Sequence, residues 1–261
     1  MLYNYLKVII RNFISDGMYT FIIIFGLAIG LAASLIIAQY VHFELSFDKQ
    51  YKDKDRIYYT YMKSKVGGDE IDGLSQPGIA PLMMRSVPEV ESSVRIAPFK
   101  WNKGTEFVLR REENGKTLFY TRVAQAYQAD PEVLDFFSIP MVAGNHKSAL
   151  NDHHSIVITR RLAEKFFPRE PALNKMLRYS YYGFPVEVKV TGVTENPLPN
   201  SSLQYDVFLL MYGREELDNM WNWGTFQTFV KLHPGADQEA VEKKINAAAA
   251  LPLSEMNREL N

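Results

Sequence analysis

The chain has 261 residues, with 29 Lys and Arg, 30 Asp and Glu, and no cysteine. A formal charge of −1 provides no basic stripe for nucleic acid. The lack of cysteine excludes disulfides and thiolate metal sites. Residues 44–261 are enough for one large domain or two small ones with hydrophobic cores.

Residues 1–16 predict an amphipathic helix at the membrane surface, next to a membrane span. Lys7 and Arg11 lie between apolar residues that recur at helical spacing, which are Leu2, Leu6, Ile9, Ile10 and Phe13. The turn signal Ser15-Asp16-Gly17 favours a break before the next element. The alternative is that this segment simply begins the helix that follows.

Residues 17–43 predict a transmembrane helix. These 27 residues contain no Asp, Glu, Lys or Arg. As a helix they would be roughly 40 Å long, against about 30 Å for the hydrocarbon core of a bilayer. The apolar core of a secretory signal is only about 7–15 residues long, and a soluble helix this apolar would need a core all round it. Those two alternatives are disfavoured.

Small residues recur every four positions on this helix, at Gly26, Gly30 and Ser34. Such a face lets a second membrane helix approach closely, so it predicts helix packing. Glycine is also common in membrane helices in general, which leaves a chance arrangement open.

The orientation of the span is ambiguous from charge alone. Two basic residues precede it, whereas four follow it closely, at Lys49, Lys52, Lys54 and Arg56. Counted by the positive-inside rule, the large domain would be cytoplasmic, but the rule is weak for long translocated domains.

The remaining chain predicts an α+β fold. Strands are expected at 56–61, 94–99, 106–110, 117–127, 155–158, 185–193, 205–210 and 226–232. Helices are expected at 76–86, 130–137, 159–167 and 236–250, with loops at 66–69, 144–154 and 196–202.

Chemical motifs are sparse. Gly115-Lys116-Thr117 resembles the end of a phosphate-binding loop, but Arg110 occupies the position of the first glycine, and Asn114-Gly115 between two strands favours a hairpin turn. The histidines near residue 150, at 146, 153 and 154, lack the spacing of helical metal ligands and are expected in a solvated loop. The acidic pairs 112–113 and 215–216 indicate surface charge. We therefore expect no catalytic, cofactor or metal site.

Several stretches together resemble one family. FELSFDKQYKDKDRIYY at 43–59 is similar to the segment after the first membrane helix of MacB/FtsX-type ABC transporter permeases. DPEVLDFFSIP at 130–140, SIVITRRLAEKFF at 155–167 and KVTGVTENPLPNSSLQYDVFLL at 189–210 resemble stretches of their periplasmic core domain. The resemblance runs in order along nearly the whole chain.

The resemblance implies a permease subunit or fragment in the bacterial inner membrane, with a cytoplasmic N-terminus. Residues 44–261 would be a periplasmic α+β domain with a porter-like part and an inserted second lobe. A separate cytoplasmic ABC ATPase would drive the membrane helices, and a stalk would pass the motion outward for efflux or other periplasmic work. The stalk would enter the domain through Glu44, Leu45, Ser46, Phe47 and Asp48. Partners would be the ATPase, further permease helices or a second permease copy, and the lipid bilayer, with no nucleic acid.

Two departures from the family pattern are visible. The chain ends at Asn261 without the three further membrane helices of the family, which predicts a truncated permease. Asn174 stands before Lys175 where related chains often have glycine, which questions the turn there. The alternatives to a permease are a single-pass anchored binding or sensor module and a membrane-anchored enzyme. The short N-terminal side disfavours a sensor, and the lack of convergent polar residues disfavours an enzyme.

Overall fold

The structure, a computed structural model, describes residues 11, 17–62, 73–99, 106–181 and 183–259. The chain divides into two compact units, Met1–Asp48 and Lys49–Asn261. The amphipathic helix expected at 1–16 lies outside the described residues except for residue 11. The domain boundaries at residues 16 and 43 therefore stay predictions.

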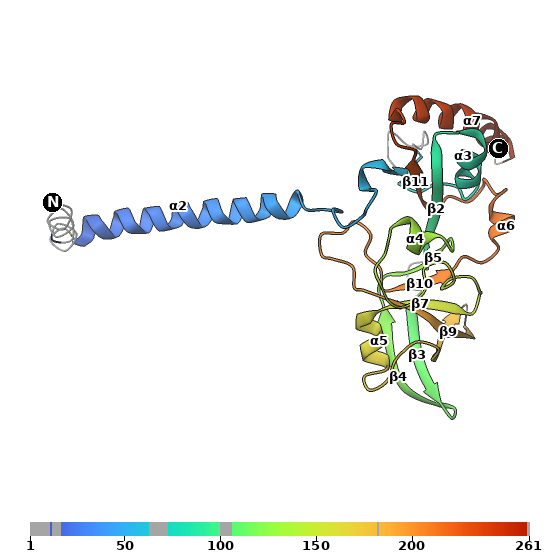
Figure 1. The fold of residues 1–261 in the computed structure, drawn as a ribbon, viewed down its shortest axis with the longest axis horizontal. Coiled ribbons are helices and arrows are strands. Elements are labelled where there is room, and N and C mark those ends of the chain that lie inside the picture. Colours follow the sequence, from blue (N-terminus) through green and yellow to red (C-terminus); the bar gives the residue numbers. More distant parts are fainter. Residues whose placement is uncertain (1–10, 12–16, 63–72, 100–105, 182, 260–261) are drawn as a thin grey trace. The chain divides into compact units, whose positions relative to one another are not determined.

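The first unit contains the long helix α2, Gly17–Glu44 (Figure 1). None of its 28 residues is buried. Of the described helices, it alone is long and apolar enough to cross a membrane. The helix ends in a turn, where the hydroxyl of Ser46 donates to the carbonyl of Phe43 at 2.6 Å. Asp48 then adopts a left-handed conformation with φ 56°. A polar hydrogen-bonded terminus therefore follows the apolar run directly.

The second unit is built on one sheet. Its strands are β1 (Ile57–Thr60), β2 (Val90–Pro98), β3 (Phe107–Glu113), β4 (Lys116–Val123), β5 (Ala126–Ala129), β6 (Met141–Gly144), β7 (Ser155–Thr159), β8 (Met176–Tyr181), β9 (Phe184–Thr194), β10 (Val207–Leu210) and β11 (Gln227–Leu232). Its helices are the 3₁₀ turn η1 (Lys54–Arg56), α3 (Ile79–Ser86), α4 (Val133–Phe136), α5 (Arg160–Phe166), α6 (Arg214–Leu217) and α7 (Gln238–Glu259). The predicted α+β class is therefore confirmed.

The sheet runs in the order β1-β11-β2-β5-β10-β7-β9-β8-β3-β4, and β6 pairs with β9 beside this path. Among the described strands, only the β5–β10 and β7–β9 pairs are parallel. The first and last strands in sequence, β1 and β11, are neighbours, and the other strands of the path continue from β11. One continuous sheet thus runs from the end at β1 and β11 to the end at β3 and β4.

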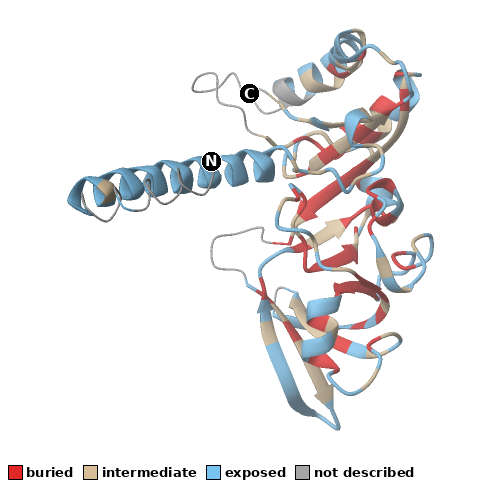
Figure 2. Cartoon of the chain, turned by 60° about the vertical axis from the view of Figure 1, so that its left-hand side comes forward, coloured by how far each residue is buried: buried red, intermediate tan, exposed pale blue. Residues whose placement is uncertain are grey.

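The central strands have both faces covered. Ile156 and Ile158 of β7 belong to a core that α5 closes, whereas Val157 between them belongs to a second core that α4 closes. Phe208 of β10 also lies in the second core. Strands buried on both faces have nearly continuous apolar sequences, such as SIVIT in β7 and VFLL in β10. Figure 2 shows this burial in red through the middle of the sheet.

Each end of the sheet has its own helical cover. Near β11, Met83 of α3 and Val241 of α7 pack with Val230 in a third core. At the other end, Leu162 and Phe166 of α5 pack against Phe107, Leu109 and Val188. Burying one such apolar side chain contributes about 1.5–3 kcal/mol, so these helices stabilise the two ends of the sheet.

Local sequence signals explain several turns. Asn114 and Gly115 have φ of 50° and 75° and connect β3 to β4, which confirms the predicted hairpin. Asn174 has φ of 67°, and its backbone N–H donates to the carbonyl of Val190 at 2.8 Å. Asparagine is the residue after glycine that most readily adopts this conformation. The questioned turn is therefore present with asparagine in it.

Some predicted elements were wrong in detail. The single strand expected at 117–127 is two strands, because β4 ends at Val123 and β5 pairs with β2 and β10 instead of β3. β6 and β8 were not predicted. Helix α3 begins at Ile79, so Pro81 lies in its first turn, where proline is tolerated. Helix α7 continues through Pro252 to Glu259, beyond the expected end at residue 250.

Candidate functional site

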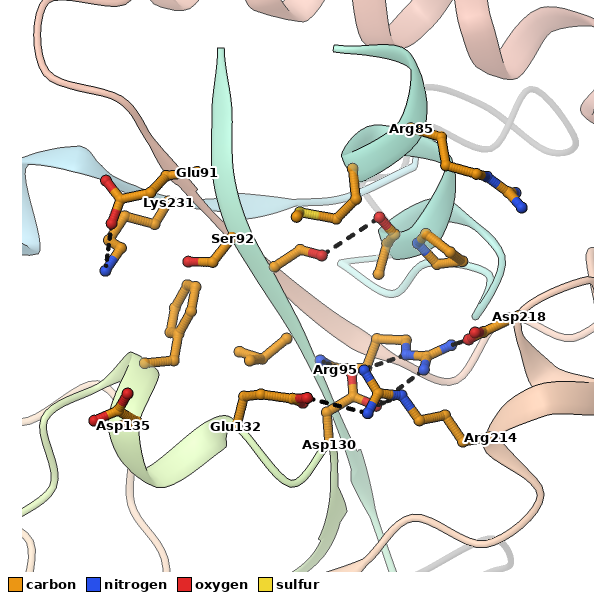
Figure 3. Close-up of a pocket in the computed structure, with 16 residues that line it drawn as sticks. Arg85, Glu91, Ser92, Arg95, Asp130, Glu132, Asp135, Arg214, Asp218 and Lys231 are labelled. Atoms are coloured by element: carbon orange, nitrogen blue, oxygen red, sulfur yellow. Dashed lines mark hydrogen bonds and ion pairs between the residues drawn. The ribbon is translucent and has the colours of Figure 1, made fainter. Parts of the chain in front are cut away.

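A buried arginine lies at the centre of the second unit. Arg95 is in β2 between two neighbouring strands, β11 and β5, and is 1% exposed. Asp130, the residue after β5, is 2% exposed and accepts from the Arg95 backbone N at 2.8 Å, from Nε at 3.0 Å and from Nη2 at 2.9 Å. Both carboxylate oxygens are thus used, in the paired geometry that gives arginine–carboxylate contacts their strength (Figure 3).

Arg95 also joins two further segments. Its Nη1 donates to the carbonyl of Pro77, before α3, at 3.0 Å and lies 2.7 Å from Oδ1 of Asp218, after α6. Burial alone would lower the pKa of Arg95, but the hydrogen bonds and charges of Asp130 and Asp218 outweigh it, so the pKa is raised. The guanidinium is therefore a permanent charge that fixes three segments to β2.

A groove of about 530 Å³ opens beside this ion pair. Arg214 of α6 lies on its rim, with Nε 3.3 Å from Asp130 and Nη1 3.2 Å from Glu132. Figure 3 shows Glu132, Asp135 and Arg85 around the same opening. Arg214 thus pairs with two acidic residues, and the rim of the groove carries charges of both signs. In the described residues no group of His, Asp and Glu could hold a metal ion.

A second charged cluster, the entry cluster of Asp53, Arg56, Glu91 and Lys231, lies where the chain enters the second unit. Arg56 donates to Asp53 at 2.6 Å, to Glu91 at 2.5 Å and to the carbonyl of Leu232 at 2.7 Å. Lys231 of β11 lies 2.9 Å from Glu91 and 3.5 Å from Asp53. Arg56 is the main cause that lowers the pKa of both Glu91 and Asp53, and Lys231 adds to it.

The same stretch is held by packing as well. Tyr51 shares a 2.6 Å hydrogen bond with the hydroxyl of Ser201, and its ring lies 5.5 Å from that of Phe137. Strand β1 follows and pairs antiparallel with β11 from Ile57 to Thr60. Residues 51–60 are therefore tied by side chains and by backbone to elements far along the sequence.

The predicted packing face lies on α2. A Cβ built on Gly26 or Gly30 would meet no atom within 4 Å, and the Ser34 hydroxyl donates to the carbonyl of Gly30 at 2.8 Å. The face is open, and its role in packing stays a prediction. Glu44 is the last residue of α2, and the other residues of the predicted stalk entry, Leu45 to Asp48, form the turn after it. Their role as a stalk also stays a prediction.

The histidines do not converge. His146 Nε2 lies 2.6 Å from the carbonyl of Ile139, and His154 Nδ1 lies 3.0 Å from the carbonyl of Glu187. The ring of His153 lies instead 5.2 Å from that of Tyr212. Each imidazole has a separate local partner.

The sequence patterns did not predict the ion pairs around Arg95 and Arg56. Asp130-Pro131 was interpreted only as the start of a helix, and Arg95 only as part of a strand. The available signal was a single charge inside the apolar run VRIAP. Such a charge must find a buried partner, but the sequence does not name the partner.

The fold and the apolar helix define a membrane-anchored protein with an α+β domain of the permease type. The MacB-like periplasmic core domain model matches residues 20–248, and the chain belongs to this family. The family supplies permease components of ABC transporters and is not itself catalytic. No curated protein matches the sequence.

One solved structure supports the fold, and two others show a weaker similarity. A domain of a protein described as a permease, from Porphyromonas gingivalis, has a TM-score of 0.61 and 26% identity, over 77% of this chain and 82% of that one. The periplasmic region of MacB from Actinobacillus actinomycetemcomitans gives 0.47 and 13%, over 77% and 83%. The extracellular domain of the noncanonic ABC-type transporter YknZ from Gram-positive bacteria gives 0.47 and 16%, over 75% and 91%.

Proposed function

We propose that this chain is a permease subunit of an ABC transporter of the MacB/FtsX type. Its N-terminus lies in the cytoplasm of a bacterium, α2 spans the inner membrane, and the domain beyond Phe43 lies outside the cytoplasm. ATP hydrolysis on a separate ATPase subunit moves the membrane helices. The domain receives that motion and performs efflux or other work outside the membrane.

The observation that carries this proposal is the anchoring of residues 51–60. A displacement of the chain at residue 48 reaches the domain first through Tyr51, Asp53 and Arg56. Arg56 holds Glu91 of β2 and the carbonyl of Leu232 at the end of β11. Those strands belong to the same sheet that holds Arg95, and Asp130 directly follows its strand β5. Motion of the entry stretch is therefore passed to a rigid sheet and not absorbed in a loose linker.

Membrane partners follow from the open face of α2. Gly26, Gly30 and Ser34 would contact another permease helix or a second permease copy, because close backbone approach is what holds helices together in lipid. The cytoplasmic ATPase would bind the permease through the cytoplasmic side of such an assembly.

Affinity purification of the tagged full chain from membranes of its own bacterium tests this function. We expect an ABC-type ATPase to co-purify in stoichiometric amount. If the chain is isolated from gently solubilised membranes with no ATPase, the permease assignment is wrong, and a single-pass anchored binding or sensor module becomes the better description.

The anchoring step has its own test in the purified complex. Hydrogen exchange of β1 and β11 should change when a non-hydrolysable ATP analogue is added. Asp53→Asn with Arg56→Gln should abolish that change while the ATPase stays bound. The matched control is Glu170→Gln with Lys175→Gln, an ion pair distant from the entry in the sequence, which should leave the response intact.

A further inference from the structure

Strand β2 has neighbouring strands on both sides only near its end. On one side it pairs with β11 from residue 90 to residue 96, but on the other side it pairs with β5 only from residue 96 to residue 98. β5 ends at Ala129, and the chain then leaves the sheet towards α4. The groove of about 530 Å³ lies beside the first half of β2, and residues 91–94 line it. In the part of the chain that the structure describes, no strand pairs with β2 there.

The backbone of Ser93 faces this groove. In an antiparallel sheet, successive residues direct their N–H and C=O groups to opposite edges of the strand. Arg95 directs its groups to the β5 edge, because its C=O accepts from the backbone N–H of Asp130 at 3.0 Å and its N–H donates to the Asp130 carboxylate at 2.8 Å. Ser93 is two residues earlier, with no bulge between them, and directs its groups to the same edge. Its N–H and C=O are therefore an open continuation of the pairing between β2 and β5.

The two walls of the groove differ in chemistry. Helix α3 forms the wall towards which the side chain of Ser93 points, since the Ser93 hydroxyl donates to the carbonyl of Ala80 at 3.3 Å. Pro81 and Met84 make this wall apolar, and Met84 is 46% exposed. Helix α4 forms the other wall, where Phe136 lies in the same core as Val94.

Asp135 is the free charge of the α4 wall. It is exposed and makes no ion pair with any described residue, whereas Glu91 is paired with Lys231 and Glu132 with Arg214. Arg85 is also exposed and makes no ion pair with a described residue, but it belongs to α3. Figure 3 shows Arg85 and Asp135 on opposite sides of β2. The α4 wall therefore offers a carboxylate to a basic group in the groove.

We propose that this groove binds an extended segment of a partner protein, which pairs with β2 at Ser93 and runs antiparallel to it, as β5 does. The residue opposite Ser93 directs its side chain to the α3 wall, so it is apolar and contacts Pro81 and Met84. The residues on either side of it direct their side chains to the α4 wall, so a basic residue there faces Asp135. Backbone hydrogen bonds to Ser93 provide affinity, and the two walls provide specificity, as in other strand-addition complexes.

The edge strands of this chain do not match the groove. The strands at the two ends of the sheet are β1, with the sequence IYYT, and β4, with the sequence KTLFYTRV. Neither has an apolar residue between two basic ones. A second copy of the chain therefore does not offer the required segment at either end of its sheet, which favours a different protein as the partner.

Fluorescence anisotropy with the full chain in lipid nanodiscs tests this binding. The probe is a labelled peptide of about five residues, Thr-Lys-Val-Lys-Thr, which is a usual length for a strand. One matched peptide carries Glu in place of both Lys residues. Another carries an N-methyl group on the valine nitrogen, which removes the donor to the carbonyl of Ser93. We expect saturable binding of the lysine peptide and at least about tenfold weaker binding of the other two.

Charge reversal on the protein gives the decisive comparison. Asp135→Lys should weaken the lysine peptide about fivefold and strengthen the glutamate peptide. The control is Glu164→Lys, which makes the same change in net charge at an exposed position of α5 that does not line the groove. It should leave both affinities unchanged, and both variants should unfold at the parent temperature.

Three results would overturn the proposal. The first is no saturable binding of the lysine peptide up to about 1 mM. The second is equal affinity of the lysine peptide for the parent and for Asp135→Lys, or equal affinity of the parent for the N-methylated peptide. The third is a dimer of the parent that Met84→Lys dissociates, because a second copy would then occupy the groove. None of these results bears on the ATPase association, so the permease assignment is tested separately.

Discussion

At Arg95 a full positive charge lies inside the domain, with both oxygens of Asp130 against it. Removing one member of such a pair leaves the other as a buried charge without a partner, which costs about 3–5 kcal/mol. We therefore expect Arg95→Met to lower the free energy of unfolding by that amount. Urea unfolding followed by tryptophan fluorescence measures it, since Trp221 and Trp223 follow Asp218 in the chain.

Arg214→Gln is the matched control. Arg214 touches the same carboxylate but is 42% exposed, so its loss should cost less than about 1 kcal/mol. Equal costs for the two substitutions would mean that Arg95 adds no more to stability than a surface charge.

The entry cluster should be sensitive to acid. The pKa values of Asp53 and Glu91 are lowered in the folded protein, chiefly by Arg56. A carboxylate with a lowered pKa adds stability above its unfolded pKa, about 4, and loses it as the pH falls through the lower folded value. The pKa of Arg56 is raised, so the cluster has no alkaline limit from this residue.

A comparison of melting temperatures checks the direction of this pH dependence. The parent should melt above Glu91→Gln at neutral pH, and the difference should shrink as the pH falls below about 4. A difference that stays constant down to pH 3 would show that ionisation of Glu91 does not stabilise the entry stretch.

Among single residues, the sequence predicted those whose conformation is set locally. The dipeptide Asn114-Gly115 is by itself a strong signal for a hairpin turn. Arg95 and Arg56 could not be predicted as anchors, because their partners are distant in the sequence. Asp130 is 35 residues from Arg95, and Leu232 is 176 residues from Arg56. Only the completed sheet brings them together.

The secondary-structure elements likewise divide into those that local sequence predicts and those that depend on distant neighbours. Strands β7 and β10 were predictable, because burial on both faces leaves a continuous apolar run. The break between β4 and β5 was not, because both halves of 117–127 suit a strand and only their different neighbours separate them. β6 is four residues long and ends at Gly144 with φ of 93°. A Cβ there would lie 2.6 Å from the carbonyl oxygen of Thr191, so glycine is required for β6 to reach β9.

The prediction for a single element concerns the small face of helix α2. Gly26→Ile with Gly30→Ile adds bulk to the small face, which should reduce co-purification with other permease helices by severalfold. Membrane insertion should be unaffected, because isoleucine is at least as apolar as glycine. The melting temperature of the domain should also stay constant, because the substitutions lie in α2 and not in the second unit.

Ala28→Ile with Ala32→Ile is the control. These alanines have the same four-residue spacing but lie on the opposite side of the helix from Gly26 and Gly30. Quantitative mass spectrometry of the purified complexes gives the readout. Equal loss in both variants, or loss in neither, would show that the small face is incidental and that α2 is a simple anchor.

For the molecule as a whole, the family and the positive-inside count point in opposite directions. Our prediction is that the domain lies outside the cytoplasm. The absence of native cysteine makes a clean test possible, since a single introduced thiol is the only one present. In spheroplasts, Lys147→Cys should react with a membrane-impermeant maleimide, and Asn4→Cys should react only after lysis.

The opposite labelling pattern would place the domain in the cytoplasm and remove the basis for extracytoplasmic work. Lys147 is an exposed residue in the turn after β6, so its thiol is accessible in the folded domain. Denatured samples of both variants supply the maximum labelling against which each reaction is scored.

The pairing of β1 with β11 also constrains the order in which the protein can be made. Ile57 lies opposite Lys231, so the strand that follows the membrane helix has to wait for nearly the entire domain to be synthesised before it finds its neighbour. Contacts this distant in sequence form late and slow the folding of sheet proteins. Throughout synthesis the nascent domain therefore stays joined to the bilayer by an unpaired strand. The strand that follows α2 is therefore fixed to the sheet only when nearly the whole domain has been made.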